Sequence, residues 1–251
     1  AIVTGSTAGI GRATAELFAE EGASVVLCGR RRELGDEVAR GIRAKGGVAS
    51  FVTADVSRAA DLRTVIGAAV STYGRLDILM NNAYSGKSRS VTEMEEADWD
   101  AAFAVTLKAA ALASKYAIPE MITGGGGSII HVSSVHGVLA ARNNAAYNAF
   151  KAALINIARN MAMDYGKHNI RVNALCPGRI VTEAKVKFLE ANPEQVVLQE
   201  MVYPLGRPGT MREAATAALF LASDDSSFVT GHALMVAGGL TAQLADAVGA
   251  Y

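Results

Sequence analysis

The chain has 251 residues, of which 51% are hydrophobic and 19% are charged, which excludes a disordered or fibrous protein. Its 24 lysines and arginines balance 24 aspartates and glutamates, so it lacks the positive field of a protein that wraps nucleic acid or binds an anionic membrane. We therefore expect one globular domain whose partner is a small molecule.

Cysteine and histidine usage bears on metal sites and on location. Cys28 and Cys176 lie far apart in apolar segments, which predicts two buried thiols rather than a disulfide or a metal site. The four histidines lack the spacing of a metal-binding pair, so we expect no metal. No apolar run reaches the ~18 residues of a transmembrane helix, because Lys108 interrupts the most apolar stretch, and we recognise no signal peptide. These features favour a soluble, cytoplasmic protein.

Apolar runs and amphipathic segments alternate along the whole chain. In chain order, the patterns predict a strand at 1–4, a helix at 12–21, a strand at 25–28, a helix at 32–44, a strand at 49–54, a helix at 59–73, a strand at 76–80, a helix at 97–122, a strand at 128–132, a helix at 144–165, a strand at 171–176, a helix at 213–222 and a strand at 233–236.

Continuous apolar strands separated by amphipathic helices predict a parallel sheet that helices cover on both faces. The expected fold class is therefore α/β, a doubly wound parallel sheet of Rossmann type in a three-layer α/β/α arrangement. No linker divides the chain, so we expect a single domain over residues 1–251. Residues 178–208 contain three prolines and are a candidate lid over a site.

A glycine-rich turn follows the first predicted strand. The residues that form it are Gly5, Ser6, Thr7, Gly9, Ile10 and Gly11. Glycines allow close backbone approach, and the helix N-terminus offers N–H groups and a positive dipole end to a pyrophosphate. The spacing differs from Gly-x-Gly-x-x-Gly, and a purely structural turn is the alternative. Its place in the first strand-helix unit favours dinucleotide binding.

The second predicted strand ends in a glycine followed by arginines, from Gly29 to Arg32, about 20 residues beyond the glycine-rich turn. An NAD enzyme places an acidic residue here for the ribose 2′-hydroxyl, and this chain has none. Guanidinium groups pair with phosphate oxygens, so Arg30 favours NADP(H) over NAD(H). The alternative is that the arginines only begin a solvated helix.

Tyr147 and Lys151 lie four positions apart in a predicted helix, so they share one face of it. A phenol has a pKa near 10, and acid/base work at neutral pH needs its ionised form favoured by about 3 units, roughly 4 kcal/mol. A neighbouring lysine and an oxidised nicotinamide can supply this stabilisation. Ser134 lies thirteen residues before Tyr147 and completes the constellation.

Together these motifs resemble the short-chain dehydrogenase/reductase family, over the whole chain and in family order. The further matching segments are Asp55-Val56, Asn81-Asn82-Ala83 and Pro177-Gly178-x-Ile180-x-Thr182. The resemblance implies hydride transfer between a nicotinamide cofactor and a carbonyl or alcohol carbon. It implies Tyr147 as the acid/base, Ser134 as the group that orients the substrate oxygen, and Lys151 as the group that lowers the tyrosine pKa and binds the nicotinamide ribose.

The resemblance also implies further cofactor contacts and an assembly. The implied contacts are Asp55 and Val56 at the adenine, Asn82 and Ala83 along the cofactor, and Pro177, Gly178, Ile180 and Thr182 after the sixth strand, the last two at the carboxamide end. The family further implies a homotetramer. The alanine-rich faces at 101–117 and 145–162 suit packing between subunits and burial against the parent sheet equally.

Three residues depart from the family pattern. Thr106 stands where the family has the asparagine of its catalytic tetrad, and we expect a slower proton relay to Lys151. Tyr84 stands where the Asn-Asn-Ala motif continues with glycine, so its phenol should reshape the floor near the nicotinamide or narrow the substrate entrance. Ala237 replaces an aspartate, a change that concerns C-terminal packing.

The function predicted is an NADP(H)-preferring oxidoreductase acting on a carbonyl or secondary alcohol, with Tyr84 and His136 near the substrate. The alternatives are an NAD(H)-dependent alcohol dehydrogenase of the same family and a catalytically weak nucleotide-binding regulatory protein. A serine hydrolase is disfavoured because Ser134 has no Gly-x-Ser-x-Gly elbow. An apolar substrate pocket is indicated by Val138, Leu139, Phe188, Leu189 and Met201.

Overall fold

Seven parallel strands form the central sheet in the computed structural model, which describes residues 1–182, 187–188, 191–192, 194 and 202–243. The strands are β1 (Ile2–Thr4), β2 (Ser24–Gly29), β3 (Val48–Thr53), β4 (Ile78–Asn81), β5 (Gly127–Val132), β6 (Ile170–Pro177) and β9 (Ala233–Val236). Their spatial order is β3-β2-β1-β4-β5-β6-β9. The order reverses at β1, which pairs with both β2 and β4, and such a switch point leaves a crevice at the strand carboxyl ends.

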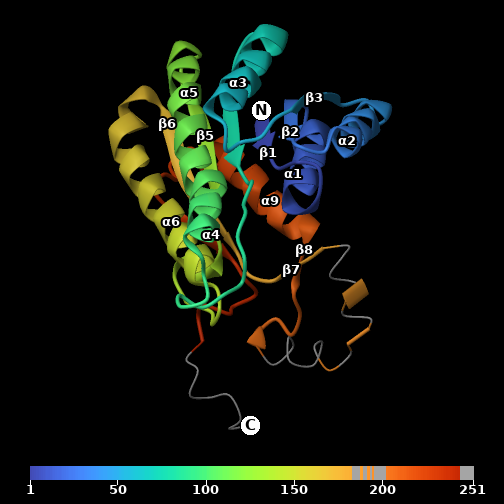
Figure 1. Ribbon diagram of the computed structural model, residues 1–251. Coiled ribbons are helices and arrows are strands. Elements are labelled where there is room, and N and C mark those ends of the chain that lie inside the picture. The colour runs from blue at the N-terminus through green and yellow to red at the C-terminus, as the bar shows by residue number, and fades with distance from the viewer. Residues whose placement is uncertain (183–186, 189–190, 193, 195–201, 244–251) are drawn as a thin grey trace.

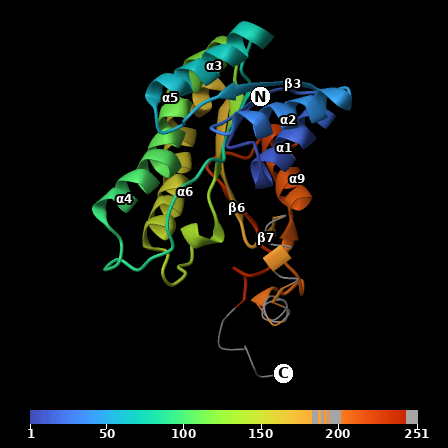
Figure 2. The ribbon, with the colours of Figure 1, turned by 45° about the vertical axis from the view of Figure 1, so that its right-hand side comes forward.

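Six longer helices cover the two faces of the sheet, three on each side (Figures 1 and 2). The helices on one face are α3 (Ala59–Tyr73), α5 (Ala109–Thr123) and α6 (Ala145–Tyr165); those on the other are α1 (Gly9–Glu20), α2 (Arg32–Ala44) and α9 (Met211–Ala222). Each group buries an apolar stripe in its own core, for example Ile66 and Ile155 in the first and Phe18 and Leu221 in the second. The doubly wound α/β/α fold predicted from the sequence is therefore confirmed.

Three elements start two or three residues away from their predicted positions, namely α1, β4 and α9, the last of which begins at Met211 and not at residue 213. Helix α1 begins at Gly9, inside the glycine-rich turn, whereas the periodicity placed its start at Arg12. Strand β4 begins at Ile78 and not at residue 76, although Leu76 is fully buried. Two short paired strands, β7 (Ile180–Val181) and β8 (Gly209–Thr210), were not expected in the region treated as irregular.

The helix predicted at 97–122 is interrupted. It consists of α4 (Glu96–Ala102), a π-helical segment (Phe103–Lys108) and α5. A π-turn accommodates one extra residue and is frequent at functional sites. Thr106 lies in this segment and is buried.

Among the described residues, the helical run Glu96–Thr123 is long and apolar enough to cross a membrane, with a mean hydropathy of 1.3 over its most apolar 18 residues. The sequence analysis expected no such segment. By its packing the run is a core helix, because Ala113 and Met121 are buried with residues of α3 and β5. The core helix of a soluble protein passes the same test, so the run is weak evidence for a membrane span.

The alanine-rich faces of α5 and α6 pack in the interior of the chain, against the central sheet. Ala109, Ala113 and Ala117 of α5 and Ala158 and Ala162 of α6 are buried in the same apolar core as the sheet. Of the two roles that the sequence left open, burial against the parent sheet is the one observed. The faces therefore carry no argument for subunit contacts.

Candidate active site

The glycine-rich turn lies at the carboxyl end of β1 and leads directly into α1. Gly5 and Gly9 adopt positive φ angles of 65° and 60°, which favour glycine, and no atom lies within 4 Å of where a Gly9 side chain would begin. The helix start at Ala8 has no side-chain cap. Ser6 fixes the turn to β2, because its hydroxyl accepts a hydrogen bond from Cys28 N at 3.0 Å. Open space above uncapped N–H groups fits a pyrophosphate.

Asn82 joins the end of β4 to this turn. Its side-chain amide donates to Thr4 O at 2.9 Å and to Gly5 O at 3.2 Å, and Thr4 Oγ1 accepts from the N–H groups of Asn82 and Ala83. A side chain at Gly11 would collide with the Asn82 amide. The glycine at position 11 therefore leaves room for the Asn82 amide, and Asn82 holds the glycine-rich turn next to the end of β4.

The arginines after β2 lie beside the turn, but Arg31 makes the contact that the structure shows. Its guanidinium donates to Thr7 Oγ1 at 2.7 Å. Arg30 is exposed and lies near enough to Asp55 to contribute to the lowered pKa of that carboxyl, whose main cause is hydrogen bonding from Ser57. From the sequence, the arginines after Gly29 were expected to suit a 2′-phosphate, and Arg30 was the one named for it. The geometry adds Arg31 to the candidate phosphate-binding groups.

Ser134, Tyr147 and Lys151 come together at the carboxyl ends of β5 and β6. Ser134 follows β5, and its hydroxyl accepts from His136 N at 3.2 Å. Tyr147 and Lys151 face each other on α6, with the Lys151 Nζ 5.3 Å from the centre of the phenol ring. Lys151 is only 2% exposed and donates to Val132 O at 2.6 Å. The spacing in the sequence thus predicted the proximity that is observed.

Burial shifts the pKa values of Lys151 and Tyr147. It lowers the pKa of Lys151 to about 7, because the charged ammonium is removed from water. It also raises the pKa of Tyr147, an effect that a hydrogen bond with Ser134 partly opposes. In this state of the protein the phenol is therefore protonated at neutral pH, and Lys151 is not among the groups that shift it.

Thr106 does not lie free to relay a proton. Its hydroxyl donates to Ser85 O at 3.0 Å and accepts from Ser85 N at 3.2 Å. The Thr106 hydroxyl therefore uses its O–H donor and one acceptor lone pair on Ser85, which lies in the loop after β4. The sequence did not predict this contact with Ser85, because the family resemblance linked position 106 only to a proton relay to Lys151.

Two aromatic rings contact Tyr147, those of Tyr84 and His136. The Tyr84 ring centre lies 5.9 Å and the His136 ring centre 5.4 Å from that of Tyr147, at interplanar angles of 76° and 87°. Tyr84 is 63% exposed and also lies 5.5 Å from Lys151 Nζ.

The segment after β6 continues this edge of the sheet. Gly178 N donates to Val236 O, and a side chain at Gly178 would press on Ala237. Tyr203, which the sequence did not single out, accepts a hydrogen bond from Arg179 N through its hydroxyl at 3.1 Å. Ile180 lies in β7, and Thr182 follows it. Much of the candidate lid at 178–208, including Leu189 and Met201 of the expected apolar pocket, lies outside the described residues.

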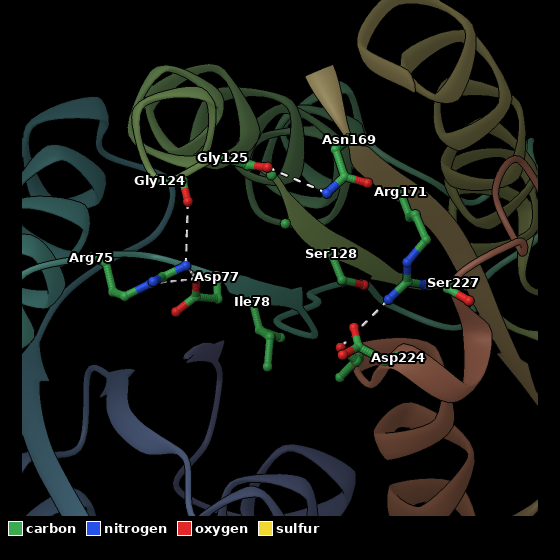
Figure 3. A pocket seen from close by; sticks show the side chains of 13 residues that line it. Arg75, Asp77, Ile78, Gly124, Gly125, Ser128, Asn169, Arg171, Asp224 and Ser227 are labelled. Atoms are coloured by element: carbon green, nitrogen blue, oxygen red, sulfur yellow. Dashed lines mark hydrogen bonds and ion pairs between the residues drawn. The ribbon is translucent and has the colours of Figure 1, made fainter. Parts of the chain in front are cut away.

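A cavity of about 260 Å³ lies at the opposite, amino-terminal ends of β4, β5 and β6 (Figure 3). Its two arginines have partners: Arg75 pairs with Asp77, and Arg171 donates to Leu221 O, Ser223 O and Ser226 Oγ. The contacts of Arg171 satisfy carbonyl groups at the C-terminus of α9, so on this side the cavity lining has a structural role. No group of three His, Cys, Asp or Glu side chains among the described residues is arranged to hold a metal ion.

Comparison with known proteins decides the family. A family model described as Enoyl-(Acyl carrier protein) reductase matches residues 5–241. An uncharacterized oxidoreductase of Thermotoga maritima is 38% identical over 244 residues, which cover 96% of this chain and 96% of that protein. The chain belongs to the short-chain dehydrogenase/reductase family.

Other short-chain dehydrogenases/reductases match over the same length. The 2-(S)-hydroxypropyl-CoM dehydrogenase 3 of Xanthobacter autotrophicus is 39% identical, with 96% of this chain and 95% of that protein covered. The crystal structure of a gluconate 5-dehydrogenase from Burkholderia cenocepacia, in complex with NADP and tartrate, has a TM-score of 0.90 at 34% identity and covers 97% of this chain and 95% of that chain. This short-chain dehydrogenase/reductase is an oxidoreductase that acts on alcohols or carbonyl compounds with a nicotinamide cofactor.

Proposed function

We propose that the chain is a reductase of carbonyl compounds, and in the reverse direction a dehydrogenase of secondary alcohols, with Tyr147 as the acid/base and NADP(H) as the preferred cofactor. One observation carries the proposal: at the carboxyl ends of the strands, Tyr147 makes a side-chain hydrogen bond with Ser134 and its ring centre lies 5.3 Å from Lys151 Nζ. Ligands of open α/β sheets bind at this edge.

The residues of the chain divide the chemistry between them. When bound, the reduced cofactor supplies a hydride for the carbonyl carbon. Tyr147 donates its phenolic proton to the carbonyl oxygen, and Ser134 holds that oxygen by a hydrogen bond. Because burial keeps the phenol protonated at neutral pH, the site as it stands suits proton donation and therefore reduction.

The cofactor would be held by groups that follow four strands, β1, β3, β4 and β6. The glycine-rich turn with Ser6, Thr7 and Ile10 would take the pyrophosphate, Asp55 and Val56 the adenine, and Ala83, Gly178, Ile180 and Thr182 the nicotinamide half. Lys151 would bind the nicotinamide ribose. The preference for NADP(H) rests on Arg31, whose guanidinium contacts Thr7, and on Arg30, which is exposed next to it in the sequence, because guanidinium groups suit a 2′-phosphate.

The test is NADPH oxidation over a panel of ketones and aldehydes, with NADH in parallel. Tyr147→Phe removes only the phenolic hydroxyl, and we expect it to lower kcat/KM by about 10²- to 10⁴-fold. Binding of NADPH, measured by fluorescence, should persist in this variant. Tight NADPH binding without turnover of any compound would favour the nucleotide-binding regulatory protein instead.

The cofactor preference has its own experiment. Arg30→Ala and Arg31→Ala should each weaken NADPH binding about tenfold while NADH binding changes little, because only NADPH carries the 2′-phosphate. Equal effects on the two cofactors would favour the NAD(H)-dependent alternative. Glu33→Ala, at an exposed neighbour on α2, is the matched control.

We also propose that the protein assembles as a homotetramer. The alanine-rich faces no longer argue for it, but Phe228 is fully exposed and Met163 on α6 is 84% exposed. Large exposed apolar side chains favour association. Light scattering after size-exclusion chromatography measures the mass directly, and a monomeric mass would overturn this proposal.

A further inference from the structure

Tyr84 is held in place from both sides through its neighbours. On one side, Ala83 N donates to Thr4 Oγ1 at 3.1 Å, which ties the loop to β1. On the other, Ser85 exchanges two hydrogen bonds with Thr106 of the π-helical segment. The backbone at Tyr84 is thus fixed at two adjoining residues, and the ring is presented at a set position.

The loop that follows Tyr84 is anchored as well. Lys87 Nζ lies 2.6 Å and Arg89 Nη1 3.5 Å from the carboxylate oxygens of Asp98 on α4, and Arg89 O accepts from Ala145 N at the start of α6. These contacts keep the loop between the π-helical segment and the helix that carries Tyr147. The loop that carries Tyr84 is therefore held in one place by contacts on both sides of this residue.

The Tyr84 ring is only partly covered by other residues of the protein. It makes an edge contact with Tyr147, yet 63% of the residue is exposed. His136 makes a second edge contact with Tyr147, and Val138 and Leu139, just beyond His136, are about half exposed. A large apolar surface beside the proton-donating phenol is what an apolar ligand would cover, because aromatic faces contribute both buried area and stacking.

We propose that Tyr84 is a specificity-determining residue that stacks on the flat, uncharged ring of a cyclic or aryl ketone while the carbonyl reaches Tyr147, and that Thr106 is its positioning residue. This inference rests on the proposed function of the site and adds the substrate class to it. It also connects two of the three departures from the family pattern: threonine at 106 holds the loop that presents tyrosine at 84.

The experiment compares kcat/KM for acetophenone with kcat/KM for 2-butanone, with NADPH as reductant. In Tyr84→Ala we expect the ratio of the two to fall about tenfold, mainly through KM for acetophenone. Tyr84→Phe keeps the ring and should keep the ratio. An unchanged ratio in Tyr84→Ala, or a fall of both values together, overturns the proposal.

Thr106 is tested with a matched pair of variants. Thr106→Val keeps the shape and loses both hydrogen bonds to Ser85, so the acetophenone ratio should fall about threefold; Thr106→Ser keeps the hydroxyl and should restore it. A defect in proton relay slows both ketones equally and leaves the ratio unchanged. An unchanged ratio in Thr106→Val therefore overturns the positioning role.

A binding measurement separates this inference from the proposed function. Saturation-transfer NMR detects acetophenone and 2-butanone on the NADPH-bound protein whether or not they react. If no ketone is reduced but acetophenone binding is lost in Tyr84→Ala and kept in Tyr84→Phe, the stacking role stands and the reductase proposal falls. If NADPH binds more tightly to Tyr84→Ala and acetophenone binds equally to both proteins, the ring obstructs the cofactor and the stacking role is wrong.

Discussion

The two ends of the central sheet treat their charged side chains differently. At the amino ends, Arg75 pairs with Asp77 and Arg171 donates to the carbonyls that end α9. At the carboxyl ends, Lys151 is buried against a backbone carbonyl and takes part in no ion pair among the described residues, and burial works against ionisation of Tyr147. The two arginines at the amino ends thus have hydrogen-bonded partners that serve stability, whereas the buried lysine at the carboxyl ends has a displaced pKa, as is frequent at functional sites.

The largest expected effect comes from replacing this buried lysine. Lys151→Met should lower kcat/KM for carbonyl reduction by about 10³-fold, since the site loses the group that would bind the nicotinamide ribose and that lies 5.3 Å from the Tyr147 ring centre. The free energy of unfolding should stay the same or rise, because a buried ammonium is replaced by an apolar chain of similar length. Steady-state kinetics and urea unfolding measure both, and a loss of stability would break the contrast between the two ends.

The second effect is a pH dependence of stability from His131, which is fully buried on β5 with Nδ1 beside the Asn81 amide. Burial lowers its pKa from 6.5 to about 4. The unfolded chain takes up this proton near pH 6.5, whereas the folded protein resists it until about pH 4. The contribution is therefore complete above pH 6.5 and falls by up to about 3 kcal/mol as the pH drops to 4.

This second effect is isolated with His131→Gln, in which the group that titrates is gone. Urea unfolding at pH 7, 6, 5 and 4 should give a shallower decline for the variant than for the original protein. Carboxylates titrate in both proteins, so only the difference between the two curves reports His131. Parallel curves would contradict the prediction.

At the amino ends, the third effect should touch stability alone. Arg171→Met removes the charged donor of the hydrogen bonds to Leu221 O, Ser223 O and Ser226 Oγ, and we expect a loss of about 2 kcal/mol in the free energy of unfolding with unchanged kcat/KM. The loss stays this small because the two carbonyls keep the hydroxyl donors of Ser128 and Ser226. Arg75→Met is the matched control. Its ion pair with Asp77 is exposed to solvent and screened, so this variant should change the free energy of unfolding much less than Arg171→Met does. Reduced turnover in Arg171→Met would show that the amino ends are not purely structural.

The smallest effect concerns the start of α9. Thr210 and Glu213 form a capping box there, with Thr210 N donating to the glutamate at 2.7 Å. Thr210→Ala should lower the free energy of unfolding by about 1 kcal/mol. Thr210→Ser keeps the cap and is the control; equal losses in the two variants would mean that the cap hydrogen bond is not the cause.

The sequence was sufficient for the order of elements and for groups that are close along the chain. The four-residue spacing of Tyr147 and Lys151 placed them on one helical face, and the glycines at 5, 9 and 11 predicted the tight turn. These predictions hold because backbone geometry alone decides them. The roles assigned to Ser134, Tyr147 and Lys151 in catalysis remain proposals.

What the sequence did not reveal depends on side-chain directions between distant segments. Thr106 reaches Ser85 only because a π-turn rotates it toward the loop, and no periodicity in the sequence marks that turn. Arg31 rather than Arg30 contacts Thr7, a choice between neighbours that the composition of the segment leaves open. Tyr203 reaches the end of β6 from a region without a motif.

The π-helical segment Phe103–Lys108 also sets the rotational phase of the helix that follows it. Each residue of an α-helix advances by about 100°, so one residue absorbed in a wide turn rotates everything beyond it by about that angle. Along this continuous helical run, Ala102 can therefore pack against Met94 and Ala146, while Ala109 packs in the core against the sheet. An insertion or deletion of a single residue here would act along all of α5, so the length of this segment is as much a part of the site as its threonine.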